Sequence, residues 1–338
     1  MRLIPFLTLV LLAASCQQKS PNPIFEVYDY EVASLIDLSA ELEVLADSLI
    51  LPEGPVWNSQ NGELLFVDNL QNKIFSWSET YGIQDHMLNA GNTGYAPNLG
   101  AGLLGPNGLA IGADNQLYLC QMGDRRVAKT TNQPSKKPEF STVADNYDGQ
   151  ILNSPNDLVV TSTGDVFFTD PPFAFFDPGA MRFMDTELRQ LDFSGVFKVD
   201  HDGGAVSVVD TLGVPNGLGL SPDNRFLYVN KMGKPFSNSD SQIVKIDLTT
   251  GRGEEFFNAD ALVKKYNNGT DLDGMDVHSS GHIFTAGPGG LLIISPEGDL
   301  MARVDTGQIT NCTFDDQESY LYITGFMNNP KLFRIKMK

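Results

Sequence analysis

Residues 155–170, PNDLVVTSTGDVFFTD, show the pattern that decides the fold. A polar residue beside Pro155 opens the stretch, an apolar run follows, and a turn containing Gly164 leads into a second apolar run. β-Branched and aromatic residues on both sides of a turn rich in small and polar residues indicate paired strands. Residues 195–200, GVFKVD, add a third run of the same kind. This part of the chain therefore predicts three strands of one small sheet.

The same pattern occurs six times from residue 53 onward, at intervals of about 40–60 residues. A fourth, outer strand is expected after each of the first five segments, for example at residues 82–88 and 300–305. Repeats of this length with four strands each are typical of β-propeller blades. The polar residues that open the six segments are Glu53, Asn107, Asn156, Asn216, Asp273 and Asn311.

The ends of the repeat region predict how the ring closes. The chain ends directly after the third strand of the sixth segment, so that this segment lacks an outer strand. Residues 41–49, ELEVLADSL, form a strand-like run with no partner of their own, and pairing them with the sixth segment covers its bare edge. We therefore expect an all-β fold over residues 41–338: a six-bladed β-propeller of four-stranded antiparallel blades, closed by an N-terminal strand. Two stacked β-sandwich domains are the alternative.

The N-terminus has the features of an export signal. Arg2 precedes an apolar run over residues 3–12, and Ala13-Ala14-Ser15 precedes Cys16. The apolar run is too short for an ordinary transmembrane helix. The pattern resembles bacterial lipoprotein signals, which implies removal of residues 1–15, a lipid on Cys16, a polar tether over residues 16–40, and a place in the periplasm or outer membrane of the cell envelope. The alternative is an ordinary secretory signal with an incidental cysteine.

Composition excludes several classes of partner. The chain has 42 Asp and Glu residues against 23 Lys and Arg, a formal charge of -19. Nucleic-acid binding needs clustered Lys and Arg, so we expect no nucleic-acid partner. A basic patch for anionic lipids is equally disfavoured, so membrane contact is expected only through the N-terminal lipid.

The opening residues of the segments are the candidate functional residues. If each segment begins with the innermost strand of a blade, six polar side chains meet at one mouth of the central channel. Carboxylate and amide oxygens, without His or Cys, are typical ligands of a hard cation such as Ca²⁺. The alternative is that these Asn and Asp residues only make turns, which is their commonest role.

Five motifs carry a family resemblance. They are EGPVW from Glu53, NSPNDLVV from Asn153, FFTDPPF from Phe167, PNGLGLSPD from Pro215 and DGMDVHSSGHIF from Asp273. Together they resemble the gluconolactonase and regucalcin family of calcium-dependent lactonases, over about residues 45–338.

The resemblance implies a metal site and a substrate. Glu53, Asn216 and Asp273 match the family's metal ligands, and Asn156 matches a residue at the same metal or on the substrate. The implied cofactor is Ca²⁺, with Mg²⁺, Mn²⁺ or Zn²⁺ as replacements, and the implied partner is a small lactone. Members that act on aldonolactones carry Arg where this chain has Ser154, so the specificity for sugar lactones is an open question.

The expected reaction is cation-assisted hydrolysis of the internal ester of a lactone. Asp273 and Asp157 are the candidates for activating water, and Asn156 and Asn107 for contacting substrate. A serine-histidine mechanism is disfavoured, because the chain has no G-x-S-x-G motif and no histidine opens a segment. His278 and His282 are therefore expected to be structural.

Residues 171–194 form the longest insertion and contain several aromatic residues. Such a loop is a candidate lid over a pocket, in which Phe173 and Phe176 contact substrate. The alternative is a loop packed on its own blade. For the whole chain, the alternative functions are a non-catalytic propeller lipoprotein that binds a ligand or partner, and a metal-dependent hydrolase of phosphate or sulfate esters.

Overall fold

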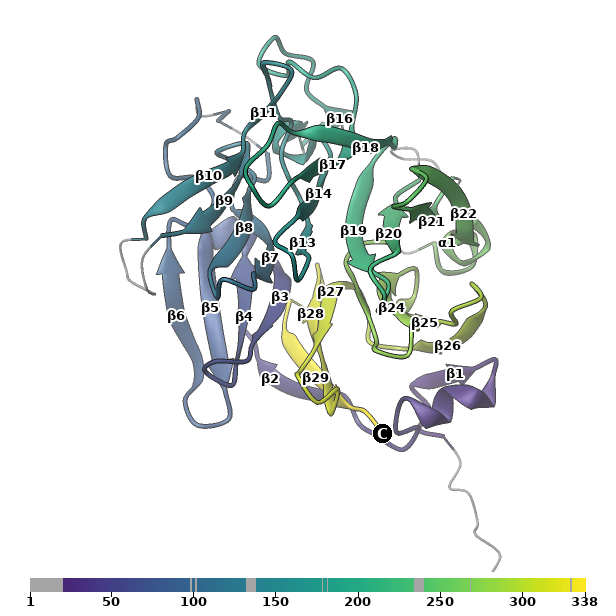
Figure 1. Ribbon diagram of the computed structural model, residues 1–338. Helices are drawn as coiled ribbons and strands as arrows, with labels where there is room; N and C mark the ends of the chain where they lie inside the picture. Colours follow the sequence, from purple (N-terminus) through teal and green to yellow (C-terminus); the bar gives the residue numbers. More distant parts are fainter. Residues whose placement is uncertain are drawn as a thin grey trace, which may run out of the picture.

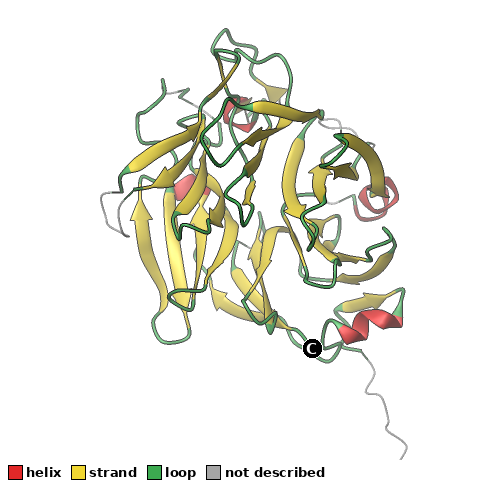
Figure 2. Ribbon diagram, viewed as in Figure 1, coloured by secondary structure: helices red, strands yellow, loops and turns green. Residues whose placement is uncertain are grey.

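The computed structural model describes residues 21–97, 99–100, 102–131, 138–177, 179–180, 182–233, 240–267, 269–328 and 330–338. The predicted signal and Cys16 lie outside these residues. Six antiparallel sheets stand around a central axis (Figure 1). Helices are few and short in the described part of the chain (Figure 2). The predicted six-bladed β-propeller is confirmed.

Blades one to four follow chain order from the innermost strand outward, and blades five and six each take one strand of the N-terminal segment at the outer edge. Blade one consists of β3 (Pro52–Asn58), β4 (Glu63–Asp68), β5 (Lys73–Ser78) and β6 (Gly82–Leu88), and blade two of β7 (Pro106–Ile111), β8 (Leu117–Gln121), β9 (Arg126–Thr130) and β10 (Phe140–Ala144). Blade three consists of β13 (Leu158–Val160), β14 (Val166–Asp170), β17 (Gly195–Val199) and β18 (Ser207–Thr211), and blade four of β19 (Pro215–Leu220), β20 (Phe226–Lys231), β21 (Gln242–Asp247) and β22 (Arg252–Asn258). Blade five contains β23 (Met275–Val277), β24 (Ile283–Gly287), β25 (Gly290–Ile294) and β26 (Leu300–Val304), and blade six β27 (Ile309–Phe314), β28 (Tyr320–Gly325), β29 (Leu332–Lys336) and β2 (Glu43–Ala46).

The remaining elements belong to connections or to the N-terminal segment. They are β1 (Phe25–Val27), the 3-10 helices η1 (Tyr30–Ser34), η2 (Asn69–Gln71) and η3 (Phe173–Phe175), the short pairs β11 (Asn146–Tyr147) with β12 (Gln150–Ile151) and β15 (Phe176–Asp177) with β16 (Arg182–Phe183), and the helix α1 (Asp260–Tyr266). No helix in the described ranges is long and apolar enough to cross a membrane.

The apolar core lies between the blades. Among the described residues it divides into six clusters, one for each pair of adjacent blades. Between blades three and four, for instance, Phe167 and Val196 pack against Leu218 and Val229. Each blade therefore depends on both of its neighbours, and the ring must close to complete the core.

The N-terminal strand closes the ring as predicted. β2 pairs antiparallel with β29, with Val44 opposite Phe333. Arg334 on β29 donates a hydrogen bond from Nε to Glu43 Oε2 at 2.7 Å. The first and last strands of the propeller thus lie in one sheet, and blade six has no bare outer edge.

The prediction of a polar tether over residues 16–40 is wrong from Phe25 onward. β1 pairs antiparallel with β26 and adds a fifth strand to blade five. Val32 and Ile36 are fully buried in the core between blades five and six. A short strand and isolated apolar residues lack the repeat pattern of the blades, and for that reason the sequence reads as a tether.

The innermost strands are joined at the end where they begin. At each junction between neighbouring blades, a hydrogen bond joins a donor on one blade to a backbone carbonyl oxygen on the next blade, close to an opening residue. These bonds are Asn69 Nδ2 to Pro106 O (3.1 Å), Gly108 N to Asn156 O (2.7 Å), Thr169 Oγ1 to Asn216 O (2.8 Å), Gly217 N to Asp273 O (3.1 Å), Gly274 N to Thr310 O (2.7 Å) and Thr310 Oγ1 to Pro52 O (2.8 Å).

Glycines allow this close approach. A Cβ added to Gly217 would lie 2.4 Å from Asp273 O and 2.6 Å from the Cα of Gly274. A Cβ on Gly108 would lie 2.4 Å from Asp157 Oδ1. The glycine after the opening polar residue is therefore a packing requirement at these two junctions.

Packing of the N-terminal segment predicts that Ile36→Ala destabilises the propeller. Loss of a fully buried Ile side chain costs about 2–5 kcal/mol of unfolding free energy, measured by denaturant unfolding. Tyr30→Ala, in the same segment but 66% exposed, should change it by no more than about 0.5 kcal/mol. If both variants unfold like the wild type, residues 21–40 are a tether after all.

The junction between blades four and five predicts that Gly217→Ala costs about 1–3 kcal/mol of unfolding free energy, or more, because the new methyl group meets backbone atoms. Gly213→Ala is the matched control from the same segment, since its added Cβ meets nothing within 4 Å. That variant should stay within about 1 kcal/mol of the wild type. Equal melting of the two variants in calorimetry would contradict the close approach.

Candidate functional site

The six predicted opening residues lie at the same end of the propeller. Glu53, Asn107 and Asn216 are each the second residue of an innermost strand, and Asn311 is the third residue of β27. Asn156 precedes β13, and Asp273 precedes β23 (both two residues before the strand). The hydrogen bonds between neighbouring blades join these same segments, so that the six residues surround one mouth of the ring.

A side-chain contact spans the junction between blades six and one. Asn311 Nδ2 donates to Glu53 Oε2 at 3.3 Å, and the same carboxylate oxygen accepts from Gly54 N at 2.8 Å. Asp157, beside Asn156, accepts from Leu158 N at 2.9 Å and also bonds the Asn311 side chain. Asn311, which was given no specific role from the sequence, therefore links the carboxylates of Glu53 and Asp157.

The mouth contains three carboxyl groups that act on one another. Burial raises the pKa of Asp157 to about 7. Burial also raises the pKa of Glu53, and the nearby Asp157 charge adds to this shift. The pKa of Asp273 lies well above its usual value because of burial and of the charges of Glu53 and Asp157. Each group resists ionisation in this arrangement, so a positive charge at the mouth would be stabilised.

The described part of the chain supplies no cation to these three groups. None of its Lys or Arg side chains forms an ion pair with Glu53, Asp157 or Asp273. Buried carboxylates are normally paired with a positive group or bound to a metal. A bound cation would supply the positive partner that these three groups lack in the described chain.

The donor set fits a hard cation. Glu53 and Asp273 offer carboxylate oxygens, and Asn156 and Asn216 offer amide oxygens, the ligand types that Ca²⁺ takes. Within the described ranges no three His, Cys, Asp or Glu side chains form a cluster that could hold a metal by themselves. A cation at the mouth would therefore need amide or carbonyl oxygens, or water, as further ligands.

Asn107 shows an unused acceptor at the same mouth. Its side chain is buried, at 5% exposed, and its Oδ1 has no hydrogen-bond partner within the part of the chain that is described. A buried amide oxygen without a donor costs free energy. This oxygen is thus available to a substrate hydroxyl group or to a cation.

The insertion between β14 and β17 lies at the same end of blade three. Ser154 Oγ donates to Pro171 O at 2.5 Å and accepts from Ala174 N at 3.0 Å, which ties η3 to the segment that carries Asn156. The rings of Phe173 and Phe176 each pack on Phe183, with centroids 6.2 and 5.7 Å away. The two predicted substrate-binding aromatics thus form one cluster beside the mouth, and their contact with substrate stays a prediction.

Two further carboxylates position the predicted ligands, and the sequence interpretation missed them. Asp170, the last residue of β14, accepts hydrogen bonds from Asn153 N and Ser154 N, both at 2.7 Å. Asp68, the last residue of β4, accepts from Ile50 N at 2.7 Å and Leu51 N at 3.2 Å. In both blades the two donors lie three and two residues before the predicted ligand, Asn156 or Glu53. The sequence feature that could have indicated this role is the Asp at the end of the second strand in both blades, as in FFTD and LLFVD.

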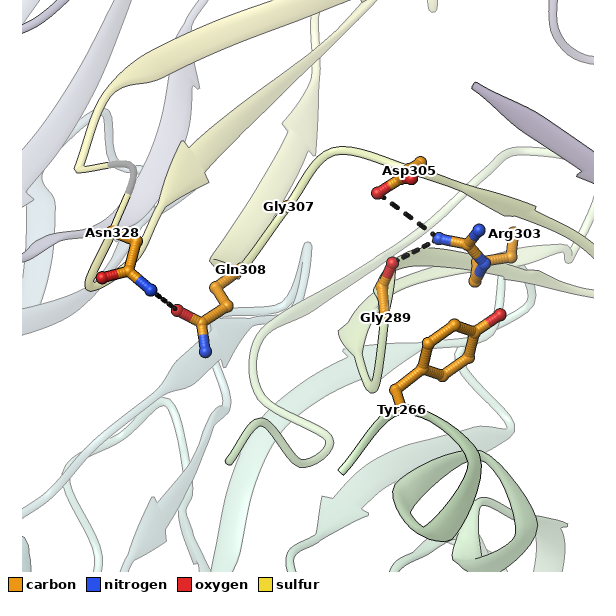
Figure 3. Close-up of a pocket in the computed structure, with 7 residues that line it drawn as sticks. All are labelled: Tyr266, Gly289, Arg303, Asp305, Gly307, Gln308 and Asn328. Atoms are coloured by element: carbon orange, nitrogen blue, oxygen red, sulfur yellow. Dashed lines mark hydrogen bonds and ion pairs between the residues drawn. The ribbon is translucent and has the colours of Figure 1, made fainter. Parts of the chain in front are cut away.

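A pocket of about 440 Å³ lies between blades five and six at the same end (Figure 3). Among the described residues, the charged groups that line it are Arg303 and Asp305, and the Arg303 guanidinium is already bonded to Gly289 O and Glu26. None of the predicted site residues lines this pocket. Its lining residues are Tyr266, Gly289, Arg303, Asp305, Gly307, Gln308 and Asn328.

Comparison with known proteins agrees with this architecture. Residues 51–326 match the model of the SMP-30/Gluconolactonase/LRE-like region. A gluconolactonase of Zymomonas mobilis is 30% identical over 308 residues, which cover 87% of this chain and 82% of that protein. A pentonolactonase of Haloferax volcanii is 24% identical over 292 residues, 83% of each chain.

Solved structures show the same fold. A gluconolactonase of Xanthomonas campestris superposes with a TM-score of 0.76 at 25% identity, over 95% of this chain and 96% of that one. The family match covers all six opening residues from Glu53 to Asn311. The chain belongs to the SMP-30/gluconolactonase/LRE-like family.

Proposed function

We propose that this chain is a lactonase that hydrolyses a small lactone at the mouth ringed by the six opening residues, with Ca²⁺ as its cofactor. The observation that carries the proposal is the group of three carboxyl residues, Glu53, Asp157 and Asp273, which come from separate blades and lack a positive partner in the described chain. The side chains of Glu53 and Asp157 are buried, and that of Asp273 is half-buried. The gluconolactonase and pentonolactonase relatives support the substrate class.

Glu53, Asp273, Asn156 and Asn216 are the residues that would hold the cation. Two carboxylates balance the double charge of Ca²⁺, and the amides add neutral oxygens. Asn311 and Gly54 N restrain the Glu53 carboxylate through hydrogen bonds. Mg²⁺, Mn²⁺ or Zn²⁺ would meet the same oxygens, but the flexible geometry of an all-oxygen mixed site suits Ca²⁺ best.

The reaction needs a polarised carbonyl group and an activated water. When bound, the cation supplies Lewis acidity toward the lactone carbonyl oxygen. Asp273 or Asp157 accepts a proton as the water oxygen attacks the carbonyl carbon. The bond between this carbon and the ring oxygen then breaks, and the ring oxygen takes up a proton. The product is the open hydroxy acid.

Recognition of the lactone falls to neutral groups on this side of the mouth. Ser154 occupies the place of the arginine of aldonolactone-specific members, and both hydrogen bonds of its hydroxyl group are used within the insertion. In the described structure Asn107 Oδ1 has no donor and can accept a hydrogen bond from a hydroxyl group of the lactone, and Asn156 lies on the next blade. Phe173 and Phe176 supply apolar surface beside them.

Removal of a carboxylate at the mouth tests the metal site. Glu53→Gln and Asp273→Asn should each weaken Ca²⁺ binding by ~100-fold or more, since even outer-shell partners of a metal contribute about 10–100-fold. Asn216→Ala should weaken it less, because only a neutral oxygen is lost. Calorimetric titration with Ca²⁺ measures the affinities, and hydrolysis of a panel of aldonolactones and simple lactones measures turnover.

Asp202→Asn, a change at an exposed turn, is the control and should leave both quantities unchanged. Full lactone hydrolysis in excess chelator would refute the metal-dependent mechanism. Ca²⁺ binding without turnover of any lactone would favour the non-catalytic binding protein. Turnover of phosphate or sulfate esters in place of lactones would favour the other hydrolase.

We also propose that the chain is anchored in the bacterial cell envelope through a lipid on Cys16. Arg2, the apolar run and the small residues before Cys16 support this proposal. In cells that express the full chain, the wild type should partition into detergent, and Cys16→Ala should move it to the soluble periplasmic fraction. A wild type that is fully soluble after export would contradict the anchor.

A further inference from the structure

A second group of reactive side chains lies at the opposite end of the propeller from the mouth. The turn between β23 and β24 carries His278 and Ser280, and the turn between β27 and β28 carries Glu318. His278 Nδ1 lies 2.6 Å from Ser280 Oγ, and His278 Nε2 lies 3.0 Å from Glu318 Oε2. His282 Nδ1 lies 2.9 Å from the same serine oxygen.

The contacts fit one assignment of the protons. Glu318 accepts from Nε2–H of His278, and Ser280 N donates to His278 Nδ1 at 3.1 Å, so that Nδ1 of a neutral His278 is an acceptor. Ser280 then donates its hydroxyl proton to His278 Nδ1, and its oxygen accepts from Nδ1–H of His282. A serine hydroxyl group, an imidazole base and an orienting carboxylate thus stand in sequence, which is the arrangement of a nucleophilic triad.

Glu318 occupies a backbone position that disfavours it. Its φ is 50°, in the left-handed region that suits glycine and asparagine. Every blade has a left-handed residue in the turn between its first two strands, and the other five are Gly or Asn. Glu318 alone is neither, and its carboxylate bonds His278 and also Ser279 N and Oγ. The six positions are Gly62, Asn115, Gly164, Asn224, Gly281 and Glu318.

The histidines are not needed to form their turn. In blade five His278 N donates to His282 O at 2.9 Å, and Gly281 N donates to His278 O at 2.7 Å. In blade three Thr161 N donates to Asp165 O at 2.8 Å, and Gly164 N to Thr161 O at 2.9 Å. The same turn is therefore made without histidine. His278, His282 and Glu318 are thus not required by the turns that carry them, which indicates a role beyond folding.

The environment suits a base next to an accessible nucleophile. The His278 ring packs edge-on against Phe314, with centroids 5.4 Å apart, and its side chain is only 14% exposed. Burial lowers the pKa of His278, so that the neutral form is present at neutral pH. Ser280 is exposed at the tip of its turn. The base is thus held by packing while the hydroxyl group meets solvent.

We propose that Ser280, His278 and Glu318 form a second, cation-independent site in which Ser280 is an activated nucleophile toward small carboxylic esters. Ser280 Oγ attacks the ester carbonyl carbon while its proton passes to His278 Nδ1, and Glu318 stabilises the charged imidazole. The bond to the alcohol oxygen breaks, this oxygen takes the proton from His278, and water then hydrolyses the acyl-serine by the same steps.

The test uses the full-length chain in excess chelator, with a fluorophosphonate probe and p-nitrophenyl acetate. The probe forms a Ser–O–P bond with loss of fluoride, and mass spectrometry locates it. We expect one label, on Ser280, and hydrolysis of the ester. Ser280→Ala should abolish the label and lower hydrolysis at least ~10-fold. Thr163→Ala, at the matching turn position of blade three, should change neither.

Glu318→Gly separates reactivity from folding. Glycine suits the left-handed position, so the melting temperature should be kept or raised, whereas the labelling rate should fall at least ~10-fold. A folded wild type without label on Ser280, or equal labelling rates for Glu318→Gly and the wild type, would overturn the proposal. Ca²⁺-dependent lactone hydrolysis should be unchanged in Ser280→Ala, so this test and that of the mouth can fail independently.

Discussion

The close approach of the six innermost strands at one end is the constraint on which the rest of the structure depends. Gly108 and Gly217 leave no room for a side chain, because a Cβ at either position would meet the next blade. The hydrogen bonds at each junction then hold neighbouring segments at the same level along the axis of the propeller. Since the residue before each of these glycines is polar, the packing that closes the ring also gathers the polar side chains.

This arrangement places like charges together. Glu53, Asp157 and Asp273 are held near one another, and burial together with the charge of a neighbouring carboxylate raises the pKa of each. An uncompensated buried carboxylate costs on the order of several kcal/mol, so a fold selected for stability alone would avoid the group. A bound cation would offset this cost, and its free energy of binding would then also stabilise the closed ring. Asp68 and Asp170 restrain the segments that carry Glu53 and Asn156, and this limits how far those ligands must move.

The sequence predicts the blades well because most of their strands pair with strands that are adjacent in the chain. Alternating β-rich runs and turns, as in residues 155–170, indicate strands whose partners are adjacent in the chain. The strand at residues 43–46 could be predicted because it had no partner of its own and the sixth blade lacked an outer strand. The N-terminal part could not be predicted in this way, because β1 joins a blade that already has four strands and therefore fills no missing place. The opening residues were likewise predictable from their repeated place. The link between His278 and Glu318 was not, because it depends on two turns that only the ring brings together.

In the proposed cation site, oxygens from several blades would hold one hard cation at this mouth. Crystals of the full chain grown with Mn²⁺ in place of Ca²⁺ would locate the ion by its anomalous scattering. We predict one strong peak within about 2.6 Å of oxygens of Glu53, Asn156, Asn216 and Asp273, which is the range of hard-cation contacts. A fully occupied ion elsewhere with no peak among these four residues would contradict the account.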